Sequence, residues 1–284
     1  MFRYYLINSK LYISLAAVAL TVGTQIQLGG QPAMHPYLFI VFFATFLEYN
    51  LTRLIVLVGY KMPLENPNDI WVNKHLKIFY FAMALASIGL LIALFYAKII
   101  VLMSLIPMIV ITALYTLPFL RLRQLDFNIR RIPFLKIVLI MVVWTFSTVM
   151  LPILQLDNSY NWKTTCLLLL ERSLLIGSLA LIFDVRDLII DRKIGLKTIP
   201  VILGERWSIF IANAMVVGFL CVSYFYYQLS NTDFLMPAAL LSFIVLLILI
   251  NHPKIRLSKF YHYFYIDGAM LLHGILIVLV YFFH

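Results

Sequence analysis

Charged side chains are scarce in this sequence. Only 12% of the 284 residues are Asp, Glu, Lys or Arg, whereas 63% are hydrophobic and the mean hydropathy is +0.98. Soluble globular domains carry roughly 25% charged and 45–50% apolar residues. The composition therefore excludes a disordered chain and a soluble enzyme of ordinary composition, and it indicates a protein that lies largely within a membrane.

Cysteine is also scarce, with Cys166 and Cys221 as the two examples, each within an apolar run. Two isolated cysteines provide neither a disulfide framework nor a metal-binding spacing. We expect both to be small, packed core residues.

Long apolar runs take up most of the chain. A helix that crosses a membrane needs about 20 apolar residues, and nine runs of about that length occur. The sequence therefore predicts an all-α, polytopic membrane protein, with nine transmembrane helices in a single domain over residues 1–284. The runs are residues 11–28, 35–60, 76–95, 98–119, 134–153, 164–183, 207–228, 234–250 and 264–283.

The basic residues are unevenly distributed between the connections of these runs. The net charge is +10, and 19 of the 22 Lys and Arg residues fall at the N-terminus or in every second connection. Lys98 and Lys163 fall in the others, and Arg172 lies inside a run. Because basic residues are retained on the cytoplasmic side, we expect a multi-pass protein, of the bacterial inner membrane, with a cytoplasmic N-terminus. This charge pattern suits contact with membrane lipid and not with nucleic acid, and no protein partner is evident.

Three of the twelve acidic residues lie close together where the sixth run ends. Asp184, Asp187 and Asp191 are spaced i, i+3 and i+7, which places them within about 60° of one another on a helix. Like charges this close repel unless cations intervene. The neighbouring Arg186, Arg192 and Lys193 could neutralise them. Alternatively, a hard divalent cation such as Mg²⁺ could bind there through one or two carboxylates and substrate phosphates.

The residues around this stripe resemble the second aspartate-rich motif of the UbiA superfamily of intramembrane prenyltransferases. The aspartates are followed by Gly195, Thr198 and Gly204, in the family's order (Asn/Asp)-x-x-Asp-x-x-x-Asp, then x-x-x-Gly-x-x-Thr and a downstream Gly. The segment from Tyr115, through basic residues, to Lys136 also resembles the family's segment after its fourth helix.

The resemblance implies a function and a site. Helices would surround a lipid-open central cavity, and a polyprenyl group would pass from a polyprenyl diphosphate to an aromatic or other small lipid-precursor acceptor, with Mg²⁺ as cofactor. Asp184, Asp187 and Asp191 would be the metal ligands and catalytic residues. The candidates for binding the diphosphate are Arg121, Arg123, Arg131, Lys136 and Lys197.

The family's first aspartate motif is degenerate in this chain. Its expected position at the end of the second run holds Asn50, with Leu51, Leu54 and Val58 where aspartates should follow. Arg53 lies one helical turn from Asn50 and could supply the positive charge that a second Mg²⁺ would give, so both are candidate catalytic residues. Glu48, Glu65 or Asp69 could alternatively reach the site.

Other readings remain open. Asp267 begins the last run and either faces the cavity or pairs with Arg256 or Lys259. Glu171 and Arg172 are expected to form a structural ion pair with a neighbouring helix.

An isoprenoid-binding, lipid-binding or transport protein on the same scaffold, without catalysis, is the alternative to a prenyltransferase.

Overall fold

Every secondary-structure element in the described part of the chain is helical. The computed structural model describes residues 8–54, 72–116, 134–156, 161–258 and 261–284. The elements are α2 (Leu11–Gln27), α3 (Pro36–Leu54), α5 (Leu76–Phe95), α6 (Ile99–Thr116), α7 (Leu135–Thr145), η4 (Phe146–Met150), α8 (Leu151–Leu156), α9 (Trp162–Ile194), α10 (Ile199–Leu203), α11 (Glu205–Ser230), η5 (Asp233–Leu235), α12 (Met236–Asn251), α13 (Pro253–Arg256), η6 (Tyr261–Ile266) and α14 (Asp267–Phe283).

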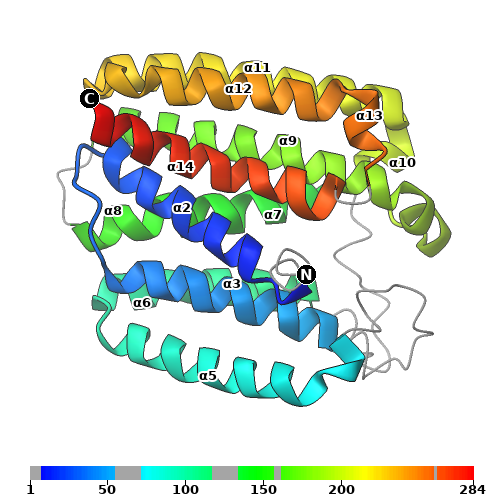
Figure 1. Ribbon diagram of the computed structural model, residues 1–284, viewed down its shortest axis with the longest axis horizontal. Coiled ribbons are helices and arrows are strands. Elements are labelled where there is room, and N and C mark those ends of the chain that lie inside the picture. The colour runs from blue at the N-terminus through cyan, green and yellow to red at the C-terminus, as the bar shows by residue number, and fades with distance from the viewer. Residues whose placement is uncertain (1–7, 55–71, 117–133, 157–160, 259–260) are drawn as a thin grey trace.

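The long helices run up and down a single bundle (Figure 1). Helices α5 and α6 lie at one edge, α11 and α12 at the other, and α2, α9 and α14 lie between them. Consecutive long helices run in opposite directions, so successive helices begin at alternate ends of the bundle. This alternation separates Lys98 and Lys163 from the end that holds Lys10, Arg53, Lys136 and the last turns of α9, as the charge pattern predicts.

Six helical segments in the described residues are long and apolar enough to cross a membrane. They correspond to six of the nine predicted runs. Two further helices, α2 and most of α6, are apolar but shorter, and α3 occupies the second predicted run. The multi-pass membrane class is therefore supported, while a total of nine crossings stays a prediction.

Helix α9 is the longest element and determines where the acidic stripe lies. Its 33 residues span about 50 Å at about 1.5 Å per residue, which exceeds the roughly 30 Å of a bilayer's hydrocarbon core. The side chain of Asn161 caps its first turn by accepting a hydrogen bond from the Lys163 amide. The helix continues to Ile194, so all three aspartates belong to one continuous helix.

The interior of the bundle holds polar as well as apolar side chains. Thr21, Thr24 and Gln25, which weaken the first apolar run, are all buried in α2. The prediction that Cys166 and Cys221 are core residues is wrong, because both are exposed on the bundle surface. A helix surrounded by lipid places apolar side chains outward as well as inward, so apolar character alone does not identify its buried face.

Candidate functional site

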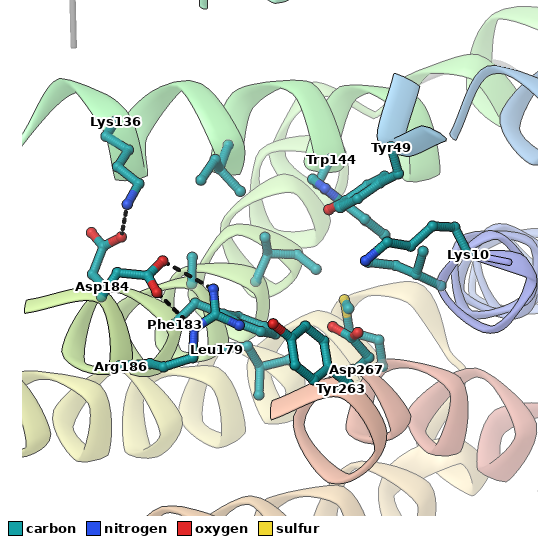
Figure 2. Close-up of a pocket in the computed structure, with 16 residues that line it drawn as sticks. Lys10, Tyr49, Lys136, Trp144, Leu179, Phe183, Asp184, Arg186, Tyr263 and Asp267 are labelled. Carbon is teal, nitrogen blue, oxygen red and sulfur yellow. Dashed lines mark hydrogen bonds and ion pairs between the residues drawn. The ribbon is translucent and has the colours of Figure 1, made fainter. Parts of the chain in front are cut away.

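One pocket in the described residues is lined by two of the three aspartates of the stripe, whereas Asp191 does not line it. Its volume is about 250 Å³, and α2, α3, α7, α9, η6 and α14 all contribute to its wall (Figure 2). Asp184 and Asp187 line it, together with apolar side chains such as Ile140, Leu179 and Met270. A charged group at the edge of an apolar chamber is the arrangement expected of a site for an amphiphilic substrate.

Lys136 of α7 holds two of the three aspartates. Its ammonium nitrogen lies 2.6 Å from Asp184 Oδ1 and 3.4 Å from Asp191 Oδ2. Both aspartates are buried, with 2% and 5% of their surface exposed. Carboxylates so buried need a partner, so Lys136 stabilises the stripe by bridging α7 and α9.

Asp187 has a different partner. Arg186 donates two hydrogen bonds to it, from Nε to Oδ1 at 2.7 Å and from Nη2 to Oδ2 at 2.9 Å. The guanidinium carbon also lies 5.1 Å from the centre of the Phe183 ring and 5.3 Å from that of Tyr263. Asp187 and the aromatic rings therefore hold the Arg186 guanidinium in the pocket wall. Figure 2 shows Arg186 near Phe183 and Tyr263.

The donor set fits a metal ion bound jointly with a substrate. No group of three or more His, Cys, Asp or Glu side chains in the described residues is arranged to hold a metal by itself. Mg²⁺, however, is commonly bound by one or two carboxylates plus substrate phosphates. Asp187 lines the pocket and Asp191 lies buried beside Lys136, so these two carboxylates would supply that number of protein ligands once Arg186 and Lys136 turn to the substrate phosphates.

The degenerate first motif lies beside the pocket instead of in its wall. Asn50 donates hydrogen bonds to the carbonyl oxygens of Ser9 at 3.1 Å and Phe46 at 2.9 Å. Arg53 donates to the carbonyl of Asn8 at 2.9 Å. Both residues therefore hold the chain immediately before Lys10, whose side chain does line the pocket.

The remaining candidate residues either line the pocket, lie elsewhere in the structure, or fall outside the described residues. Lys136 lines the pocket, and Lys197 is exposed and does not line it. Arg256 pairs with Glu205, and Asp267 lies in the pocket wall. Glu48 belongs to α3 and does not line the pocket. The other candidates lie outside the described residues: Arg121, Arg123, Arg131, Glu65, Asp69 and Lys259.

Sequence reasoning missed Lys10 and Tyr263 as pocket residues. In the sequence, Lys10 is one of the basic residues near the N-terminus, and Tyr263 is one of 17 tyrosines. The ammonium of Lys10 lies 5.5 Å from the centre of the Tyr263 ring and 5.8 Å from that of Tyr49. The position of a basic residue just before the first apolar run was a signal for Lys10, whereas nothing in the sequence distinguished Tyr263.

Solved structures with the same fold cover nearly the whole chain. The apo structure of a UbiA homolog from Aeropyrum pernix K1 is 13% identical, with a TM-score of 0.65, over 96% of this chain and 98% of that chain. A UbiA homolog from Archaeoglobus fulgidus bound to GPP and Mg²⁺ is 11% identical, with a TM-score of 0.62, over 97% and 99%. A structure of digeranylgeranylglyceryl phosphate synthase is 15% identical, with a TM-score of 0.58, over 98% and 96%.

Comparison of sequences gives the family. None of the curated proteins matches the chain. The model of the UbiA prenyltransferase family matches residues 73–261, which is more than half of the 284 residues and includes the whole acidic stripe. The stripe, the helical bundle and this match agree, and the chain belongs to the UbiA prenyltransferase family.

Proposed function

We propose that this protein is an intramembrane prenyltransferase that moves a polyprenyl group from a polyprenyl diphosphate to a small acceptor. The observation that carries the proposal is the pairing of Asp184 and Asp187 with Lys136 and Arg186 at the polar end of an apolar pocket. Family membership and the neighbour bound to GPP and Mg²⁺ support the same reaction class.

The polar end of the pocket suits a diphosphate. Lys136 can contact its oxygens as a point charge, and the planar guanidinium of Arg186 can donate two parallel hydrogen bonds. We propose that Asp187 and Asp191 hold Mg²⁺, which when bound would supply further positive charge to the departing diphosphate. These cations stabilise the charge that develops on the leaving group.

The apolar walls suit the other product of bond cleavage, an allylic cation. Phe183, Tyr263, Tyr49 and Trp144 contribute aromatic side chains to the pocket (Figure 2). Aromatic faces attract cations, and a pocket with few waters slows hydrolysis of a reactive intermediate. The volume of about 250 Å³ is below the roughly 300–1,000 Å³ of small-molecule pockets, so a long prenyl tail must extend out between the helices.

The reaction is tested with the full chain purified in detergent. We expect it to release pyrophosphate from geranyl, farnesyl or geranylgeranyl diphosphate in the presence of Mg²⁺, and a suitable acceptor to raise the rate at least tenfold. Chelation with EDTA and the variant Asp187→Asn should each abolish release. Asp233→Asn, which changes an exposed acid at the other end of the bundle, serves as the matched control and should retain the wild-type rate.

A non-catalytic lipid-binding or transport protein is the second candidate. It is favoured by the existing contacts of Lys136 and Arg186 with the aspartates, because carboxylate oxygens that already bind these cations are less available to a metal ion. Tight copurification of lipid, with no pyrophosphate released from any donor, would establish this function and exclude the transferase.

We also propose that the end of the bundle with the pocket faces the cytoplasm of a bacterial cell. The charge asymmetry between the two ends supports this orientation. In a variant without Cys166 and Cys221, a membrane-impermeant maleimide applied to intact cells should label Lys163→Cys and should leave Lys193→Cys unlabelled. The reverse result would invert the topology.

A further inference from the structure

Asp267 is a buried acid that the proposed binding of the diphosphate does not use. It lies at the start of α14, in the wall of the pocket, and only 8% of its surface is exposed. Its Oδ1 atom is buried and has no hydrogen-bond partner within the described structure. An unsatisfied carboxylate oxygen inside a protein is costly, so its presence in a pocket wall points to a ligand that donates a proton or a hydrogen bond.

The backbone immediately before Asp267 departs from α-helical geometry and packs closely against α2. A π-helical segment, η6, immediately precedes it, and such segments are rare and occur frequently at functional sites. The Tyr12 ring stacks on Phe264 with ring centres 5.2 Å apart, and its hydroxyl donates to the Phe264 carbonyl oxygen. A side chain at Gly268 would overlap the same hydroxyl, so glycine at this position permits the close approach of α2.

The groups that face Asp267 come from several elements. Lys10 precedes α2, Tyr49 belongs to α3, Arg186 to α9, and Tyr263 to η6; all four line the same pocket. Both Lys10 and Arg186 lie over the Tyr263 ring, at 5.5 and 5.3 Å from its centre. Figure 2 shows Tyr263 and Asp267 below Lys10, with Lys136 and Asp184 at the opposite side of the view.

We call Lys10, Tyr263 and Asp267 the acceptor corner and propose that Asp267 is a catalytic residue that takes the proton lost by the acceptor. The proposal rests on the proposed transferase function and assigns the acceptor a hydroxyl group. In the transfer, the bond between prenyl C1 and the diphosphate oxygen breaks, and the diphosphate leaves with the electron pair. The acceptor oxygen bonds to C1, and its proton passes to the carboxylate of Asp267. Lys10 and Tyr263 position the acceptor beside the carboxylate.

The test separates donor binding from proton transfer. The full chain in detergent, with Mg²⁺ and geranylgeranyl diphosphate, is assayed with water as the sole hydroxyl acceptor and then with added 4-hydroxybenzoate, 1-naphthol or glycerol 1-phosphate. The variants are Asp267→Asn, Asp267→Glu and Asp267→Ala, the last with and without sodium formate, and Asp233→Asn is the control. Binding of the unreactive thiolo analogue of the donor is measured in each.

We expect Asp267→Asn to bind the thiolo analogue within about twofold of wild type and to release pyrophosphate at least about 100-fold more slowly, the scale of general-base effects. Asp267→Glu should recover part of the rate, and formate should raise the rate of Asp267→Ala by supplying the missing carboxylate. A rate for Asp267→Asn within threefold of wild type would overturn the role of Asp267, as would loss of analogue binding or failure of both rescues.

The assay distinguishes failure of the transferase function from failure of the role assigned to Asp267. Should wild-type protein release no pyrophosphate from the donor with any acceptor, the transferase function fails and Asp267 has no proton to take. Should wild-type protein react and Asp267→Asn react equally well, the transferase function stands and the acceptor corner alone is refuted.

Discussion

At the residue scale, Lys136 determines how the acidic stripe is arranged. The sequence placed it among the candidates for diphosphate binding, and the structure adds a second role, because its ammonium joins Asp184 and Asp191 across two helices. The local alternative, in which Arg186, Arg192 and Lys193 neutralise all three acids, holds for one pair alone, Arg186 with Asp187. The cation that the two buried aspartates contact belongs to α7, and Lys136 lies 55 positions before Asp191 in the sequence.

Arg53 belongs to the same scale, and its placement changes its expected role. Sequence spacing suggested that it supplies charge to the site, but its guanidinium donates to the Asn8 carbonyl. Lys10, which follows Asn8 by two residues, lines the pocket and adopts a left-handed backbone conformation with φ of 64°. Such a conformation is uncommon for a non-glycine residue, so the hydrogen bonds from Arg53 and Asn50 to its neighbours help to maintain it.

We therefore predict that Arg53 acts through Lys10. In assays of pyrophosphate release, Lys10→Met should lower the rate by about tenfold or more, equivalent to about 1.4 kcal/mol, and Arg53→Ala should lower it less. The variant carrying both changes should be no slower than Lys10→Met, because the positioning of an absent ammonium has no further effect. Multiplicative losses would instead show that Arg53 acts on the substrate independently.

At the element scale, close packing of α2 against α14 places both sides of the acceptor corner. These helices have one of the most extensive contacts in the bundle. A Cβ atom at Gly274 would overlap the backbone of Ala19 and Leu20, so the two helices approach backbone to backbone. Small residues at helix contacts permit this approach in membrane proteins.

We predict that Gly274→Ala destabilises the bundle by about 1–3 kcal/mol, the usual cost of overpacking. The added methyl group meets backbone atoms, which cannot rotate away. Gly23→Ala is the matched control in the same contact, because its Cβ would meet the flexible end of Ile277 at 3.2 Å, and its effect should be smaller. The measurement is the free energy of unfolding in mixed detergent micelles, and equal effects of the two changes would contradict the backbone contact.

At the scale of the whole molecule, a buried polar network joins five helices, α2, α9, α11, α12 and α14, and contains none of the three aspartates of the acidic stripe. Glu171 and Arg172 of α9 and His273 of α14 have no exposed surface. Arg172 donates to the Leu20 carbonyl at 3.1 Å and to Gln27 of α2 at 2.9 Å. His273 lies 3.3 Å from Glu171 and 2.9 Å from Ser242 of α12, and Gln27 donates to Tyr227 of α11.

This network differs in part from the expected ion pair with a neighbouring helix, because the two charges pair within α9 and Arg172 contacts α2 through uncharged groups. The sequence paired Glu171 and Arg172 with a neighbouring helix, and the structure shows Arg172 bound to α2 and Glu171 beside His273 of α14. The two charges also lie 3.6 Å from each other. A buried ion pair specifies one arrangement of helices, because any other arrangement leaves a charge unpaired.

We predict that Arg172→Met lowers the free energy of unfolding by about 3–5 kcal/mol, since it leaves Glu171 buried without its cation. Adding Glu171→Gln to that variant should restore part of the loss, because the second change removes the uncompensated charge. Unfolding in mixed micelles measures both. A double variant less stable than Arg172→Met alone would show that the carboxylate stabilises the bundle independently of Arg172.

The sequence by itself determined the membrane class, the all-helical fold, the positions of most helices and the family. These features follow from local quantities: the length of apolar runs, the placement of Lys and Arg, and the spacing of Asp184, Asp187 and Asp191 along one helix. The predicted runs at residues 76–95 and 98–119 differ from α5 and the described α6 by a few residues at most. Hydrophobic transfer and helical periodicity act over a turn or a membrane thickness, so a single chain segment contains the information.

Only the tertiary structure decided which side chains meet in the pocket. The contact between Lys136 and Asp184, the meeting of Lys10 with Tyr263, the burial of Asp267 and the role of Arg53 all join residues from different helices. The outward orientation of Cys166 and Cys221 was decided in the same way. In a membrane, both the lipid-facing and the inward-facing sides of a helix are apolar, so sequence pattern cannot orient a helix, and packing between helices sets its rotation.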